Sequence, residues 1–95
     1  MKHAGAAALD QLEDLLAKLR AQPLKEPKRG TFYRDGSAFL HFHEDPEGMF
    51  ADLKLGGEFE RFRVSTRKEQ AELLRRVASE LAAQAAPSRG TRRGA

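Results

Sequence analysis

The chain has 95 residues, of which 40% are hydrophobic and 33% charged, and it contains no cysteine. This length suits one hydrophobic core, and the missing thiols exclude a disulfide framework, a thiolate metal site and a cysteine nucleophile. The net charge of +3 resides in residues 87–95, which carry Arg89, Arg92 and Arg93 and no acid; the remaining 14 basic residues equal the 14 acidic ones. We therefore expect a single, formally neutral domain over residues 1–86 and a disordered basic tail over residues 87–95.

The chain has no apolar run of membrane length. Its early apolar stretch, residues 4–9, is shorter than the core of a signal peptide and runs directly into Asp10. These features predict a cytoplasmic protein that does not enter a membrane.

Helical periodicity comes first along the chain. Leu9, Leu12, Leu16 and Leu19 form one stripe, which predicts an amphipathic helix that begins within residues 6–8. It ends near residue 22 because Pro23 cannot continue the hydrogen-bond ladder. Residues 23–29, with two prolines and three basic residues, are expected to form an extended connector.

Three turn signals divide the next segment. Asp-Gly at 35–36, Asp-Pro-Glu-Gly at 45–48 and Gly-Gly at 56–57 are typical of hairpins. They predict strands at residues 30–34, 37–44, 49–55 and 58–64. Thr66 and Glu69 then form a capping box that opens a second helix, with an apolar stripe that ends before Pro87. The predicted fold is α+β: a four-stranded antiparallel meander between two helices that pack on one face of the sheet.

Closing the hairpins in the simplest register assigns every strand residue to a face of the sheet. The face predicted to form the core collects Tyr33, Ala38, Leu40, Phe42, Met49, Ala51, Leu53, Leu55, Phe62 and Val64. The opposite face collects Phe32, Phe39, His41, His43, Phe50, Asp52, Lys54, Phe59, Arg61 and Arg63. This second face mixes rings and charges, so we expect any functional surface to lie there.

The sharpest local feature is His41-Phe42-His43. Two histidines two positions apart on a strand point the same way and can hold one metal ion, with Asp52 of the next strand as a third ligand. His3 lies at the far end of the sequence, so no third histidine is expected nearby, and Asp52 also fits as the ion-pair partner of Arg61. A metal site at His41, His43 and Asp52 is therefore an alternative hypothesis.

Two other functions compete for the same face. Phenylalanines on an open sheet are typical of a buried contact, which predicts a homodimer or a protein partner. Rings interleaved with arginine and lysine also suit single-stranded nucleic acid, with Arg89, Arg92 and Arg93 of the tail adding phosphate contacts. No pattern indicates an activated nucleophile or an oxyanion site. The main hypothesis is a non-enzymatic interaction module that needs no cofactor.

The central segment, residues 30–64, resembles short conserved bacterial proteins of unknown function, especially in the stretches AFLHFHEDP and FERF. The resemblance implies no activity. The order helix, meander, helix is also similar to the frataxin-like arrangement, in which acidic residues of the first helix bind iron. Asp10, Glu13 and Asp14 occupy the corresponding element, but the similarity is one of layout and we do not carry the iron function over.

Overall fold

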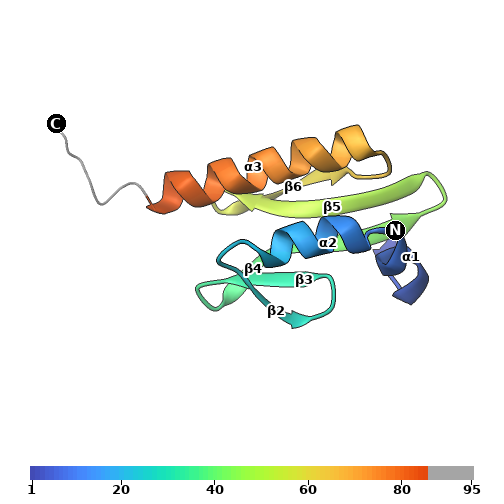
Figure 1. Cartoon of the computed structure of the whole chain (residues 1–95), viewed down its shortest axis with the longest axis horizontal. Helices are drawn as coiled ribbons and strands as arrows, with labels where there is room; N and C mark the ends of the chain where they lie inside the picture. Colours follow the sequence, from blue (N-terminus) through green and yellow to red (C-terminus); the bar gives the residue numbers. More distant parts are fainter. Residues whose placement is uncertain (86–95) are drawn as a thin grey trace, which may run out of the picture.

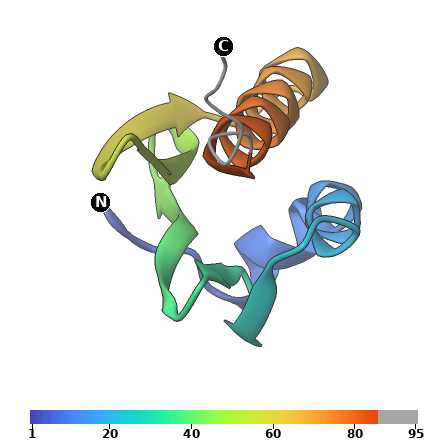
Figure 2. The same ribbon diagram turned by 90° about the vertical axis from the view of Figure 1, so that its left-hand side faces the viewer.

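In the computed structural model, which describes residues 1–85, a curved antiparallel sheet lies against helices (Figure 1). Figure 2 shows α2 and α3 on the concave side of the sheet. The helices are α1 (Ala6–Gln11), α2 (Glu13–Arg20) and α3 (Arg67–Ala85). The strands are β1 (Lys2–His3), β2 (Lys25–Lys28), β3 (Thr31–Arg34), β4 (Ser37–Asp45), β5 (Gly48–Leu55) and β6 (Glu58–Arg63). The predicted α+β class with an antiparallel sheet is confirmed.

The sheet has six strands, so the predicted count of four is wrong. Its order is β2-β3-β4-β5-β6, and β1 pairs with β4. The connector predicted at residues 23–29 contains β2, which pairs with β3. On one edge of β4, β3 pairs with residues 37–41 and β1 with residues 43–44, so the two strands lie end to end.

The first helical segment also differs from its prediction, because it forms two helices. The break falls at Leu12, whose amide donates to the carbonyls of both Ala8 and Leu9. The leucine stripe keeps its role in both halves: Leu9, Leu12, Leu16 and Leu19 all lie in the core. At α3 the predicted capping box is confirmed, since Glu69 and Thr66 exchange backbone-to-side-chain hydrogen bonds of 3.0 and 3.1 Å.

The hairpins have the predicted turns and, with one exception, the predicted register. Asp35 and Gly36 both have positive φ, as a two-residue turn of this kind requires. The exception is a bulge between β3 and β4: Tyr33 pairs with Ala38, but Phe32 pairs with Leu40. Phe39 is the extra residue. Beyond it, Phe32 lies on the face opposite to its prediction.

Glu26 joins the end of α2 to the turn between β2 and β3. Its carboxylate accepts hydrogen bonds from Arg20 Nε, at 2.6 Å, and from the Gly30 amide, at 2.9 Å. Burial raises the pKa of Glu26, but the hydrogen bonds from Arg20 and Gly30 outweigh it, so the pKa lies below the ordinary 4.5. The ionised form is therefore the one that the folded state favours.

Replacing Glu26 with glutamine should lower the free energy of unfolding at pH 7 by about 1 kcal/mol, since the Arg20 end of the ion pair is partly exposed. The carboxylate stabilises the fold above about pH 4.5, and this contribution is lost as the pH falls through the lowered folded-state pKa. Urea unfolding at pH 7 and pH 3 measures the effect. Glu58→Gln, at an exposed position of β6, is the control. A deficit of equal size at both pH values would show that the charge of Glu26 plays no part.

Candidate metal centre

The convex sheet face carries the predicted rows of residues from β4, β5 and β6. The first row is His41, Asp52 and Arg61; the second is His43, Phe50 and Arg63; Lys54 and Phe59 form a third pair. The register of these three strands is therefore confirmed. It follows from two hairpins whose turn residues and alternation of faces agree.

Phe32 and Phe39 do not belong to this face, and their assignment to it is wrong. Their exposed fractions are 0% and 2%, and both lie in the core cluster. The bulge is the reason, because it pairs Phe32 with the core residue Leu40. Phe50, which is half-buried, and Phe59, which is 44% exposed, are the phenylalanines that remain of the four predicted there.

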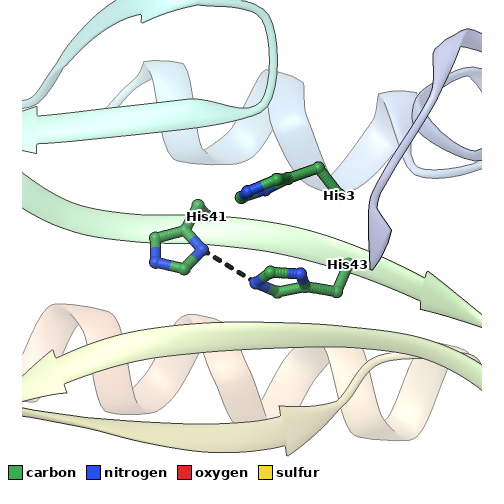
Figure 3. Close-up of side chains that lie close together, drawn as sticks. All are labelled: His3, His41 and His43. Atoms are coloured by element: carbon green, nitrogen blue, oxygen red, sulfur yellow. Dashed lines mark hydrogen bonds between the residues drawn. The ribbon is translucent and has the colours of Figure 1, made fainter. Parts of the chain in front are cut away.

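A third histidine joins the predicted pair. Strand β1 places His3 directly opposite His43, and Figure 3 shows the three imidazoles gathered above β4. The His3 and His43 rings stack with their centroids 4.7 Å apart, and the His3 and His41 centroids are 6.0 Å apart. The expectation of no third histidine nearby is wrong. Strand β1 has two residues, Lys2 and His3, and neither is apolar. It therefore shows no alternation of apolar and polar residues by which a strand could be predicted from the sequence.

The spacing of the ring nitrogens suits a metal ion. Nδ1 of His41 lies 3.1 Å from Nε2 of His43, and one nitrogen from each of the three rings lies within 4.8 Å of the others. Zinc–nitrogen bonds of about 2.0–2.1 Å place two nitrogens of a tetrahedral site about 3.4 Å apart. One pair already has nearly this spacing. The His3 nitrogen, within 4.8 Å of the other two, must move closer to complete the set, and the side chain is exposed.

Asp52 adjoins the cluster through His43. Its Oδ2 lies 3.2 Å from His43 Nε2, while Arg61 donates to both carboxylate oxygens, at 2.8 and 2.9 Å. The hydrogen bonds from Arg61 outweigh burial and hold the pKa of Asp52 below its ordinary value. The predicted Asp52–Arg61 ion pair is therefore confirmed. As a partner of Arg61, Asp52 supplies fixed negative charge beside the three imidazoles.

The surroundings of His41 favour its neutral form, in which one ring nitrogen is unprotonated and can bind a metal ion. Burial lowers the pKa of His41; the charge of Asp52 opposes this, and the neighbouring imidazoles add to it. Nδ1 of His43 is buried and has no hydrogen-bond partner among residues 1–85. A buried N–H without an acceptor is costly, so the His43 proton belongs on Nε2, between His41 and Asp52. A metal ion that binds Nε2 requires the neutral ring to carry its proton on Nδ1 instead, so metal binding at this nitrogen must offset the cost of an N–H without an acceptor among residues 1–85.

Two acidic residues of the first helical segment form ion pairs with arginines. Asp10 and Glu13 each lie 2.9 Å from a guanidinium nitrogen of Arg29, and Glu13 also pairs with Arg20. Their charges are compensated within the fold, which supports leaving the iron function of the frataxin-like layout aside. The predicted tail residues Arg89, Arg92 and Arg93 lie outside the described residues.

Comparisons with known proteins add no relative. We found no match to a protein-family model, a curated protein or a solved structure. Within residues 1–85, no helix is long and apolar enough to cross a membrane. The inference of function therefore rests on the geometry of the site.

Proposed function

We propose that the protein binds a transition-metal ion, with zinc the best match, through His3, His41 and His43. The observation that carries the proposal is the third histidine, which β1 brings within 4.8 Å of a pair that β4 already aligns. Three imidazoles from two strands form a donor set that a chance His-x-His pair lacks.

The donor chemistry selects the class of metal. Imidazole nitrogens suit zinc, copper, nickel and iron, whereas magnesium and calcium prefer oxygen ligands. Zinc tolerates the tetrahedral arrangement that three neighbouring ring nitrogens and one further ligand supply. Asp52 lies beside His43, but Arg61 pairs with both of its oxygens and largely offsets the attraction it adds for a cation.

The three imidazoles supply three donors, and zinc commonly takes a fourth ligand in a tetrahedral arrangement. We infer that this fourth position is open to water or a small ion.

Zinc titration of the full chain at pH 7.5, followed by calorimetry and by the imidazole NMR signals, tests the proposal. We expect one saturable site that shifts the signals of all three histidines. Alanine at any one of them should weaken binding at least about tenfold, since even outer-shell partners are worth about 10–100-fold. Lys2→Ala, one residue from His3 in the same strand, is the matched control. Unchanged affinity in His3→Ala would contradict a site of three histidines.

Self-association or partner binding through the convex sheet face, the main hypothesis from the sequence, stays a prediction. The apolar surface available for it is smaller than predicted, because Phe32 and Phe39 lie in the core. Phe50 and Phe59 support it, and Phe59 is flanked by Lys54, whose ammonium lies 5.5 Å from the ring centroid. The ring of Phe59 and the ammonium of Lys54, with Arg61 and Arg63, support the nucleic-acid alternative. Light scattering of wild type and Phe50→Arg tests self-association, and titration with single-stranded RNA at two salt concentrations tests the other.

A further inference from the structure

The strand that carries His3 has few attachments to the rest of the fold. Strand β1 spans two residues, paired as Lys2 with Glu44 and His3 with His43. After it, the Ala4 amide donates to the Phe42 carbonyl at 3.1 Å. The chain then leaves the sheet at Gly5 and enters α1. A strand of two residues is expected to open easily.

Glu44 provides a side-chain attachment at this exit point. Its Oε2 accepts a hydrogen bond of 2.6 Å from the Gly5 amide. Because successive side chains of a strand alternate between faces, Glu44 points to the face opposite His43. Glu44 is therefore no ligand of the metal centre. It acts on the centre through the position of the backbone that carries His3.

We propose that Glu44 is a positioning residue of the metal centre: by holding the Gly5 amide, it docks β1 against β4 and brings His3 to His41 and His43. The inference rests on the proposed function. The coupling also acts in the other direction, because a metal ion bound to both His3 and His43 holds β1 against β4. Docking of the strand and metal affinity must then strengthen each other by the same factor.

The size of the effect follows from the docked fraction. Where only part of the population has β1 in place, the apparent zinc affinity of the three-histidine site falls to that fraction of its intrinsic value. Loss of the Glu44 hydrogen bond should weaken zinc binding roughly five- to tenfold, near the lower end of typical couplings between sites. The effect should vanish when His3 is absent, because docking then no longer supplies a ligand.

A double-mutant cycle tests the inference. Zinc affinity is measured by calorimetry for wild type, Glu44→Ala, His3→Ala and the double variant, with Glu47→Ala as the control that removes the same charge from the exposed turn nearby. We expect Glu44→Ala to weaken binding in wild type and to change nothing in the His3→Ala background. Glu44→Gln, which keeps an acceptor, should be intermediate.

Hydrogen exchange of the Ala4 and Gly5 amides in the wild-type protein provides a second readout that needs no variant. Saturating zinc should slow the exchange of both amides, while those of β6 remain unchanged. Three results would overturn the inference: equal affinities for Glu44→Ala and Glu47→Ala, an equal loss in both backgrounds, or unaltered exchange at Ala4. If these occur while alanine at each histidine still weakens zinc binding at least about tenfold, the metal site stands and the role of Glu44 fails. If wild type does not bind zinc, both fail.

Discussion

Replacing Phe32 with alanine is expected to lower the free energy of unfolding by about 3–5 kcal/mol, the usual cost of removing a fully buried phenylalanine ring. Phe32 has no exposed surface and packs in the core cluster beneath the helices. The alanine leaves a cavity that the surrounding leucines fill only in part. Denaturant unfolding of the variant and of wild type measures the loss.

The matched control is Phe59→Ala. In the simplest hairpin register Phe32 and Phe59 belong to the same sheet face, but Phe59 is 44% exposed and its ring contacts His41 and Lys54. Its removal should cost about 1 kcal/mol. Similar losses for the two variants would contradict the bulge between β3 and β4, because only the bulge moves Phe32 into the core.

This bulge marks the limit of what turn chemistry predicts. The turns at 45–48 and 56–57 set the register of β4, β5 and β6, because the pattern of apolar and polar residues agrees with them along each strand. At 35–36 the turn sets the first two pairs, and then Phe32 and Phe39 compete for the core. Inserting one residue buries both rings, a gain of tertiary packing that no local signal records.

The candidate site was predictable in part, for a related reason. His41, His43 and Asp52 share a face through strand alternation and hairpin register. His3 is 38 positions from His41 in the sequence, and its place depends on backbone hydrogen bonds between β1 and β4 together with the Glu44–Gly5 contact. Pairing between distant segments is decided by the assembled sheet, so composition and spacing leave it open.

The charge pattern of the exposed edge bears on self-association. Edge strand β6 carries Glu58 and Glu60 on one face and Arg61 and Arg63 on the other. Antiparallel pairing of two β6 strands about a two-fold axis keeps the faces aligned, so like charges would meet across the new pair. This edge is therefore protected against pairing with itself. A homodimer of this chain is expected to use the Phe50 and Phe59 surface instead.

Zinc at one hundred times its dissociation constant is expected to raise the free energy of unfolding by about 2.7 kcal/mol at pH 7.5, if the unfolded chain binds it weakly. For a domain of this size the increase corresponds to a rise in Tm of about 10–20 °C. Thermal unfolding with zinc, and again after a chelator is added, measures it. His43→Ala should lose the increment, whereas Lys2→Ala should keep it.

The zinc increment should disappear on acidification to pH 5. Histidines ordinarily titrate near pH 6.5, and ligands must give up their protons before a metal ion binds. The metal-free protein is itself pH-dependent: since burial lowers the pKa of His41, the unfolded chain takes up that proton first, and folded stability falls as the pH drops below about 6.5. The increment must therefore be taken as a difference between zinc and chelator at each pH. An increment of equal size at pH 5 and pH 7.5 would point to carboxylates, and away from the three histidines, as the ligands.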